Sequence, residues 1–505
     1  MLQAGPITPE RIADVEAVIR PHIRRTPVLI ADMADFGGEA RPTPLKLECL
    51  QHSGSFKARG AFANLLSRRI PTAGVVAASG GNHGAAVAYA ASRLKIPATI
   101  FVPEVTSPAK AALIRGYGAN LIIGGHRYAD ALAASEKFVA EHGALAIHAF
   151  EQEETLLGQG TLGKEIEADL PEIDTLLVAV GGGGLIGGIA ACVKTLYPRV
   201  KIIGVEPEDA AAMHDSLRAA SRVTLDHVGL FADGVAVKRV GDETFRICRA
   251  LLDEVVLVST DAICAAIKDV FEDTRSILEP AGALAIAGAK AWAARSKVHG
   301  KTLVAVASGA NTNFDRLRFV AERAEVGEQR EAVLAVTIPE TPGSFRKFCS
   351  LLGARNITEF NYRYDDPRMA HVFVGVQVGS RAESLKLVDS LRRHGLDTLD
   401  LTEDEMAKLH VRHMVGGHAP VANELLYRFE FPERPGALMK FLNSMSASWN
   451  ITLFHYRNHG ADYGRVLVGM QVPAREKGAF RAFLKNLGYA NWDETKNPAY
   501  RMFLG

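Results

Sequence analysis

The sequence predicts an α/β fold with mostly parallel sheets, followed by two copies of a small α+β domain. Three observations support this prediction. Short apolar runs alternate with Ala-rich helical stretches from Arg20 to Phe319, the segment Ala321–Arg330 is polar and charged, and several short motifs recur after it. Alternating strands and helices are typical of sheets whose crossovers are helical. A recurring set of motifs is typical of a duplicated domain.

The strands of the first part are predicted where apolar, β-branched runs stand between polar or glycine-rich segments. These runs are Gly74–Ala78, Ala98–Val102, Asn120–Ile123, Thr175–Val180, Lys201–Val205, Val255–Val258 and Leu303–Ala307. Helices are predicted in the Ala-rich segments between them. They include Gly84–Leu94, Pro108–Gly116 and Ile186–Leu196.

The repeat after Arg330 predicts two copies of a β-α-β-β-α-β domain. Four motif pairs recur in one order: E-x-P-G at residues 340–343 and 433–436, N-I-T at 356–358 and 450–452, Y-R at 362–363 and 456–457, and V-G-x-Q-V at 374–378 and 468–472. We expect E-x-P-G to form a loop and N-I-T to form a turn. The connection between the copies is assigned to Thr402–Asn423, which includes Gly416-Gly417. Duplication alone leaves open whether the copies bind a ligand or only mediate assembly.

Bulk composition excludes several classes of protein. The chain has 505 residues, which predicts two or three cores, and its 58 Lys and Arg nearly balance its 57 Asp and Glu. No strong overall field therefore draws it to nucleic acid or to an anionic membrane. No uninterrupted apolar run is long enough to span a bilayer. The five cysteines include no C-x-x-C pair, and residues 1–20 lack an apolar signal segment, so we expect reduced cysteines and a cytoplasmic location.

The motif Ser55-Phe-Lys-Ala-Arg-Gly60 contains the candidate catalytic residue Lys57. A lone lysine is normally a solvated surface charge. Here the small neighbours Gly54, Ala58 and Gly60 would let a planar group approach the backbone closely at an expected helix start. A desolvated lysine has a lowered pKa and can form Schiff bases with carbonyl compounds. Lys57 is therefore a candidate nucleophile.

The motif Ser79-Gly-Gly-Asn-His-Gly84 directly follows a predicted strand and precedes a predicted helix. A glycine-rich turn at a helix N-terminus exposes backbone N–H groups, which suit a carboxylate. Ser79 and Asn82 add side-chain hydrogen-bonding groups. His83 alone is weak evidence, because most histidines are structural or exposed.

The motif Gly181-Gly-Gly-Gly184 also lies between a predicted strand and a predicted helix. Four glycines permit a nest of N–H groups that would bind a phosphate. The spacing of Gly182, Gly184 and Gly187 also fits the G-x-G-x-x-G of a dinucleotide-binding fold. The acidic residue that this alternative needs at the end of the second strand is only loosely matched by Glu206.

The motif Ser308-Gly-Ala-Asn311 follows the last predicted strand of the first part. A hydroxyl at this place can meet a ring nitrogen without protonating it, whereas an aspartate would create a pyridinium and a stronger electron sink. Ser308 therefore favours elimination over transamination.

Together these motifs resemble those of the fold-type II pyridoxal-phosphate enzymes, and nearly the whole chain resembles the biosynthetic threonine deaminases (threonine ammonia-lyases). The matching segments are S-F-K-x-R-G, S-x-G-N-H, the tetraglycine loop, Phe271–Gly282 and Ser308–Arg318. The resemblance implies a tryptophan synthase β-like catalytic domain at residues 1–325 with two α/β subdomains, the smaller at roughly 50–150. It implies two ACT-like, ferredoxin-like regulatory domains at 330–403 and 424–505.

The resemblance also implies roles for single residues. Lys57 would hold pyridoxal 5′-phosphate as a Schiff base, Asn82 would meet its 3′-oxygen, and Ser308 would meet its ring nitrogen. Phe56 would pack beside the ring. The implied cofactor-binding residues are Phe56, Lys57, Asn82, Gly181, Gly182, Gly183, Gly184 and Ser308. The implied residues of the substrate-carboxylate site are Ser79, Gly81, Asn82 and His83. Glu279 lies where the family keeps an active-site carboxylate, without an assigned role.

Two departures from the related serine racemases narrow the activity. Those enzymes carry a second serine where this chain has Gly80, so racemisation is disfavoured. Their divalent-metal site needs a carboxylate where this chain has Ala212. We therefore predict no metal-binding residues, while binding of a monovalent cation is left open.

The implied reaction is β-elimination of L-threonine to 2-oxobutanoate and ammonia, the first step of isoleucine biosynthesis, with Lys57 taking the Cα proton. Feedback inhibition by isoleucine, relief by valine and a homotetramer are also implied, and L-serine is an alternative substrate. The alternatives are a serine dehydratase or a threonine synthase of the same cofactor class, and a catalytically inactive amino-acid sensor. The intact Lys57, Asn82, Gly181–Gly184 and Ser308 argue against the sensor.

Overall fold

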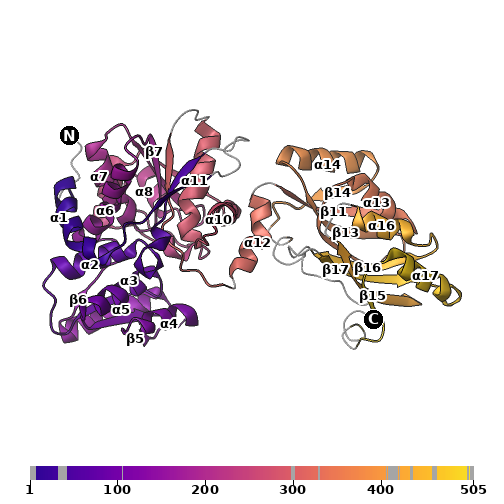
Figure 1. Ribbon diagram of the computed structural model, residues 1–505, viewed down its shortest axis with the longest axis horizontal. Helices are drawn as coiled ribbons and strands as arrows, with labels where there is room; N and C mark the ends of the chain where they lie inside the picture. The colour runs from indigo at the N-terminus through magenta and orange to yellow at the C-terminus, as the bar shows by residue number, and fades with distance from the viewer. Residues whose placement is uncertain are drawn as a thin grey trace. The chain divides into compact units, whose positions relative to one another are not determined.

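The protein folds into two compact units, Met1–Gly327 and Glu328–Gly505 (Figure 1). The computed structural model describes residues 7–31, 42–104, 106–296, 302–314, 316–327, 330–364, 366–404, 407, 419, 421–432, 436–457, 463–497 and 500. Most of the predicted connection Thr402–Asn423 and residues 433–435 of the second E-x-P-G motif lie outside them. Among the described helices, none has the length and apolar character needed to cross a membrane.

The first unit contains a six-stranded sheet in the order β1-β2-β10-β7-β8-β9. β1 is antiparallel to β2, and all other neighbours are parallel. The strands are β1 (Val28–Ala31), β2 (Thr43–Lys46), β7 (Thr175–Ala179), β8 (Lys201–Pro207), β9 (Glu254–Val258) and β10 (Leu303–Val306). Because β7 and β10 are parallel neighbours, the turns that follow them open at the same edge of the sheet.

A second, smaller sheet in this unit has four parallel strands in the order β5-β4-β3-β6. The strands are β3 (Val75–Ala78), β4 (Ala98–Val102), β5 (Asn120–Ile123) and β6 (Leu145–Ala146). β3 and β6 are neighbours, so the Ser79–Gly84 motif after β3 and the segment Ile147–Glu151 after β6 leave the sheet side by side.

Helices cover both faces of the six-stranded sheet. The helices of the unit are α1 (Pro9–Ile19), α2 (Lys57–Ser67), α3 (Asn82–Leu94), α4 (Pro108–Gly116), α5 (Tyr128–His142), α6 (Glu153–Asp169), α7 (Gly184–Leu196), α8 (Ala212–Arg218), α9 (Asp242–Leu251), α10 (Thr260–Thr274), α11 (Pro280–Ser296) and α12 (Arg316–Gly327). In β7, Leu176 and Val178 join the apolar cluster that includes α6 and α7, whereas Leu177 and Ala179 join the cluster around α10 and α11. Burial on both faces explains why the predicted strands are continuously apolar.

The predicted elements of this unit differ from the observed ones mainly at their ends. α3 and α7 each begin two residues before the predicted start, at Asn82 and Gly184, inside the glycine-rich motifs. The two units divide after Gly327, within the segment Ala321–Arg330 that was predicted as a boundary, and α12 extends into this segment as far as Gly327. Arg323 of this helix forms an ion pair with Asp261 of α10. The charged side chain of Arg323 therefore packs within the first unit.

The second unit repeats β-α-β-β-α-β twice. The first copy consists of β11 (Glu331–Pro339), α13 (Ser344–Leu352), β12 (Ile357–Arg363), β13 (Met369–Gln377), α14 (Arg381–Arg393) and β14 (Asp397–Asp400). The second consists of β15 (Glu424–Pro432), α16 (Ala437–Ser444), β16 (Asn450–Arg457), β17 (Tyr463–Gln471), α17 (Lys477–Leu487) and β18 (Asn491–Asp493). The N-I-T motifs were predicted as turns, but β12 begins at the Ile of the first motif and β16 at the Asn of the second. Their β-branched Ile and Thr suit the pleated surface of a strand.

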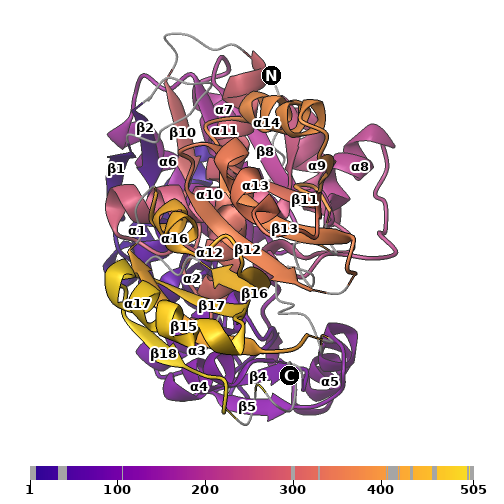
Figure 2. The ribbon, with the colours of Figure 1, turned by 90° about the vertical axis from the view of Figure 1, so that its right-hand side faces the viewer.

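The two copies share one eight-stranded sheet in the order β14-β11-β13-β12-β16-β17-β15-β18. β12 and β16 pair in antiparallel orientation from Glu359 and Arg457 to Arg363 and Leu453. The helices α13, α14, α16 and α17 lie on one face of this sheet (Figures 1 and 2). Between the sheet and the helices, the Phe345 ring of the first copy lies 5.5 Å from the Phe454 ring of the second. The copies therefore have one common core.

Candidate active site

All eight residues predicted to bind the cofactor line one cavity in the first unit. They are Phe56, Lys57, Asn82, Gly181, Gly182, Gly183, Gly184 and Ser308. Lys57, Asn82 and Gly184 are the first residues of α2, α3 and α7. Three helix N-termini therefore converge on the cavity, and their unpaired N–H groups favour anionic ligands.

Lys57 is partly buried and lines this cavity. Its Nζ donates a hydrogen bond to the carbonyl oxygen of Ala149 at 2.8 Å and lies 5.0 Å from the centroid of the Phe56 ring. Burial lowers the pKa of Lys57 to about 8, and the carboxylate of Glu279 opposes this shift. The amine is therefore available in its neutral, nucleophilic form near physiological pH.

A buried ion cluster anchors α2 close to Lys57. The Arg59 guanidinium donates two hydrogen bonds of 2.8 Å to Glu48 and two of 2.8 and 3.0 Å to Glu165. The Lys46 ammonium lies 2.9 Å from a Glu165 oxygen. Arg59 and Lys46 have no exposed side-chain surface. Since Arg59 lies two residues after Lys57, this cluster fixes the end of α2 that presents the amine.

The tetraglycine turn is shaped by close neighbours. Gly183 has a φ of +92°, and a Cβ on Gly182 would overlap the ring of Phe150. The Thr244 hydroxyl donates to the carbonyl oxygen of Gly182 at 2.6 Å and holds the turn in place. The turn thus presents backbone rather than side chains to the cavity, next to the N-terminus of α7. This arrangement suits a phosphate group.

The four residues predicted for the substrate carboxylate separate into two groups. Of these described residues, Asn82 lines the cavity, whereas Ser79, Gly81 and His83 are not part of its lining. The Ser79 hydroxyl accepts a hydrogen bond from the Gly81 N–H at 3.2 Å. The His83 Nε2 lies 2.8 Å from the carbonyl oxygen of Ile147, and burial lowers the pKa of His83 to about 3. His83 therefore has its backbone N–H, in the first turn of α3, to offer to a carboxylate.

Ser308 and Glu279 complete the polar lining. The Ser308 hydroxyl donates to the carbonyl oxygen of Ala281 at 3.2 Å, and it can rotate to another partner. The Glu279 side chain accepts a hydrogen bond from Asn82 Nδ2 at 2.5 Å. Burial raises the pKa of Glu279 to about 7, and the bond from Asn82 opposes this shift. An amine and a carboxyl group with opposite pKa shifts thus share the cavity, which is typical of a catalytic site.

Sequence reasoning missed two contributors to this site. The first is the segment after β6, where Ala149 supplies the carbonyl oxygen for Lys57 and Phe150 lines the cavity. A carbonyl oxygen is common to all residue types, so it leaves no pattern in the sequence. The second is Asn311, whose Nδ2 donates to Asn82 Oδ1 at 2.7 Å. It lies within the S-G-A-N motif, which was the available indication.

Glu206 bears on the dinucleotide alternative. Its carboxylate oxygens accept hydrogen bonds from the N–H groups of Met213 at 2.9 Å and His214 at 2.8 Å, in the first turn of α8. Burial raises the pKa of Glu206 to about 8. A carboxyl group bound in this way has no exposed surface from which to bind ribose hydroxyls, which argues against a dinucleotide.

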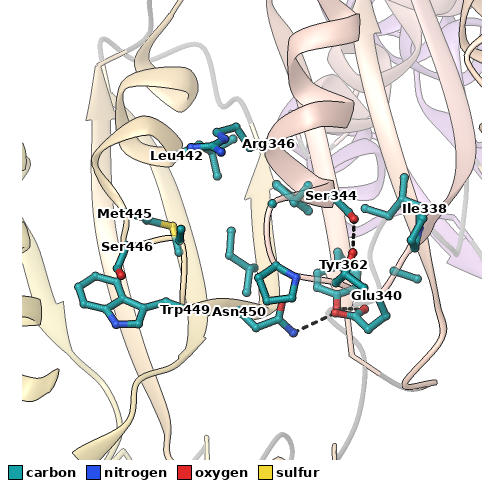
Figure 3. A pocket seen from close by; sticks show the side chains of 18 residues that line it. Ile338, Glu340, Ser344, Arg346, Tyr362, Leu442, Met445, Ser446, Trp449 and Asn450 are labelled. Atoms are coloured by element: carbon teal, nitrogen blue, oxygen red, sulfur yellow. Dashed lines mark hydrogen bonds between the residues drawn. The ribbon is translucent and has the colours of Figure 1, made fainter. Parts of the chain in front are cut away.

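The second unit contains a cavity between its two copies (Figure 3). The first copy contributes Ile338–Arg346, Tyr362 and Ala370, and the second contributes Leu442, Met445–Ala447 and Trp449–Ile451. Asn450 Nδ2 donates to Glu340 Oε1 at 3.0 Å, and the Tyr362 hydroxyl donates to Glu340 Oε2. The E-x-P-G loop of one copy therefore meets the N-I-T motif of the other.

Comparison with known proteins decides the family. A family described as pyridoxal-phosphate dependent enzyme matches residues 19–309, and one described as the C-terminal regulatory domain of threonine dehydratase matches residues 322–411 and 415–504. The L-threonine dehydratase biosynthetic IlvA of Burkholderia multivorans is 54% identical over 475 residues, covering 92% of this chain and 93% of that protein. The Escherichia coli protein of the same name is 48% identical over 464 residues, covering 91% and 90%. The chain belongs to the biosynthetic threonine dehydratases.

Solved structures agree with this assignment. The processed form of threonine deaminase isoform 2 from Solanum lycopersicum has a TM-score of 0.59 and 38% identity, and the match covers 62% of this chain and 92% of that one. A maize serine racemase has the same TM-score of 0.59 and 32% identity, and the match covers 63% of this chain and 97% of that one. The predicted family, fold class and pyridoxal-phosphate dependence of this dehydratase are thereby confirmed.

The cavity of this dehydratase fits its cofactor. A primary amine at Lys57 can join the aldehyde, and a turn without side chains at Gly181–Gly184 can surround the phosphate. The hydroxyl of Ser308 lies on the same wall as these glycines, because β7 and β10 are neighbours. All eight residues predicted to bind the cofactor already lie in the lining of this cavity.

Proposed function

We propose that this dehydratase converts L-threonine to 2-oxobutanoate and ammonia by β-elimination, the first step of isoleucine biosynthesis. The observation that carries this proposal is one cavity lined by the Lys57 amine, the tetraglycine turn and Ser308. When bound, pyridoxal phosphate supplies an aldehyde that joins an amine and a ring that withdraws electrons from the adjacent carbon.

The residues of the chain hold the reactants and move one proton. Lys57 retains the cofactor through Nζ and, after the substrate amine has replaced it, Nζ accepts the proton from the substrate Cα. Its lowered pKa provides the neutral amine that a general base requires. The N–H groups in the first turn of α3 bind the substrate carboxylate. Ser308 meets the ring nitrogen as a neutral partner, which favours elimination.

The test compares Lys57→Ala with the wild type in an assay of oxoacid release. Loss of the amine is expected to remove the visible absorbance of the bound cofactor. Turnover should fall about a thousandfold or more. Lys137→Ala, at an exposed lysine of α5, is the matched control and should retain both. Turnover of threonine, serine and phosphohomoserine separates the proposal from its alternatives. Full activity of Lys57→Ala would refute the assignment.

We further propose that isoleucine inhibits the enzyme and valine relieves inhibition through the cavity of the second unit. An aliphatic amino acid needs an anion for its ammonium group, N–H donors for its carboxylate and an apolar wall. Glu340 offers the anion, and the N-terminus of α13 after Gly343 offers the donors. The apolar wall comes from the second copy, at Leu442, Met445 and Trp449. An oxoacid assay in which added isoleucine leaves the rate unchanged would contradict this proposal.

The proposed assembly is a homotetramer in the cytoplasm. Light scattering of the purified enzyme is expected to give four times the chain mass of 54.4 kDa. A single chain mass at working concentrations would exclude the tetramer.

A further inference from the structure

The side chain of Asn82 is part of a series of directional hydrogen bonds that spans the cavity wall. Asn311 Nδ2 donates to the carbonyl oxygen of Ser53 at 2.6 Å and to Asn82 Oδ1 at 2.7 Å. Asn82 Nδ2 in turn donates to Glu279 Oε1 at 2.5 Å. Two segments distant in the sequence, at Asn311 and Glu279, thus bind the Asn82 amide, and Ser53 binds Asn311.

The chemistry of these groups allows only one orientation of the Asn82 amide. A backbone carbonyl only accepts, so Asn311 must direct its NH₂ group towards Ser53 and Asn82. Asn82 must then present its oxygen to Asn311 and its NH₂ group to Glu279. A flipped Asn82 would place its NH₂ group against the NH₂ group of Asn311, which loses that hydrogen bond and sets two donors against each other.

This orientation leaves one N–H of Asn82 for a ligand. An amide NH₂ group has two hydrogens, and Glu279 takes one. Among the residues that the structure describes, the second hydrogen has no acceptor, and Asn82 lines the cofactor cavity. The donor is therefore already aimed when a ligand enters, and binding does not have to reorient it.

Two glycines make room for these bonds. A Cβ on Gly309, in the S-G-A-N motif, would overlap Glu279 Oε1. A Cβ on Gly54 would lie 2.6 Å from Asn311 Oδ1, and Gly54 has a φ of +75°. Gly309 stands within the S-G-A-N motif and Gly54 directly before the motif Ser55–Gly60, so both motif regions also accommodate the groups that orient Asn82.

We propose that Glu279 is a positioning residue that, together with Asn311, orients the Asn82 amide so that its remaining N–H donates to the 3′-oxygen of pyridoxal phosphate. The inference rests on the proposed function of Asn82 as the partner of that oxygen. A hydrogen bond to the ionised 3′-oxygen stabilises the ionised form, which absorbs at longer wavelength than the protonated form. The ratio of the two absorption bands therefore reports on the orientation of Asn82 independently of turnover.

The experiment measures this band ratio in holoenzyme variants at one pH. Glu279→Ala is expected to lower the ratio of the long-wavelength to the short-wavelength band about tenfold, which corresponds to a shift of about one pKa unit at the 3′-oxygen. Glu279→Gln should stay within about threefold of the wild type, because its amide oxygen can accept the same bond. We expect kcat to fall with the ratio while KM changes less, because the proposed role of Glu279 acts through Asn82 on the cofactor rather than on the substrate.

Three further variants make the result specific. Asn311→Ala removes the bond at the other end of the Asn82 amide and should lower the ratio in the same direction, which also decides the matter if Glu279→Ala does not fold. Adding Glu279→Ala to Asn82→Ala should not change the band ratio further, because Glu279 acts on this ratio through its hydrogen bond with Asn82. Glu206→Gln removes a different buried carboxylate of the same unit and should leave the ratio as in the wild type.

Distinct results overturn distinct claims. If Glu279→Ala and Asn311→Ala keep the wild-type ratio, or if Glu206→Gln lowers it equally, Glu279 does not position Asn82. A wild-type enzyme without a visible band after incubation with the cofactor would instead overturn the proposed function and, with it, this inference.

Discussion

At the scale of single residues, burial sets the ionisation of the two groups that share the cofactor cavity. Removal from water lowers the pKa of Lys57 to about 8 and raises the pKa of Glu279 to about 7. Both shifts favour the neutral form, because a low-dielectric surrounding disfavours charge. An amine that is neutral at moderate pH can act as nucleophile and base without a separate activating residue.

The rate of covalent cofactor uptake by the apoprotein should therefore rise with pH up to about 8 and then level off. Below its pKa, the neutral fraction of Lys57 grows about tenfold per pH unit. The titratable group that acts on the pKa of Lys57 is the Glu279 carboxylate, which opposes the shift. Burial and the nearby Lys57 charge lower the pKa values of His83 and His148. Stopped-flow absorbance measures the rate. A rate that still rises near pH 10 would show an ordinary lysine.

Much of the site could be predicted from residue types, but the groups that hydrogen-bond to the cavity-lining side chains could not. Lys57, Asn82 and Ser308 stand in motifs whose composition already indicates a ligand. The function of Glu279 had no such indication, because its partner Asn82 is 197 positions away and the bond between them exists only in the folded chain. Their proposed roles towards the cofactor remain predictions that the variants above test.

At the scale of elements, the strand–turn–helix unit of β7, the tetraglycine turn and α7 builds the proposed phosphate site. The strand was predictable because both of its faces are buried, which makes it continuously apolar. The start of α7 was not, because glycine has low helix propensity and the sequence alone gives no reason to extend a helix into a glycine run. Contact with Phe150 and the bond from Thr244 fix that turn in space.

Gly182→Ala should weaken cofactor binding about ten- to hundredfold, the range expected for one added methyl group in a packed site. The new Cβ would overlap the Phe150 ring and push it or the turn into the cavity. Titration of the apoprotein with pyridoxal phosphate measures the affinity. Gly116→Ala is the matched control, because a Cβ at this exposed end of α4 meets nothing within 4 Å. Equal affinity for both variants would show that the turn tolerates side chains.

At the scale of the whole molecule, the internal repeat predicted two copies of one domain. It did not predict that the copies form one continuous sheet through β12 and β16. Which strand edges pair depends on their exposure in three dimensions, and the motifs do not encode it. In this shared sheet, the two N-I-T motifs have different hydrogen-bond partners. Asn450 of the second copy donates to Glu340, whereas Asn356, at the same place in the first copy, donates to Gln377 at 2.9 Å.

This difference between Asn450 and Asn356 allows the proposed regulatory role of the cavity to be tested, with Asn356 as the control. Asn450→Ala should raise the isoleucine concentration for half-inhibition about five- to tenfold, because Glu340 loses a charge-assisted hydrogen bond that orders the cavity. Asn356→Ala removes the equivalent amide outside the cavity and should respond to isoleucine as the wild type does. Steady-state inhibition curves provide the measurement. Identical shifts in both variants would contradict the assignment of the cavity.

The pairing of β12 with β16 has a mechanical consequence. Backbone hydrogen bonds run from the Glu359–Arg457 pair to the Arg363–Leu453 pair, so neither copy can swing away from the other without breaking them. A small molecule bound in the cavity between Glu340 and Trp449 therefore cannot rotate one copy away from the other without loss of these hydrogen bonds. We expect it instead to change the twist of the shared sheet, which continues through both copies from β14 to β18.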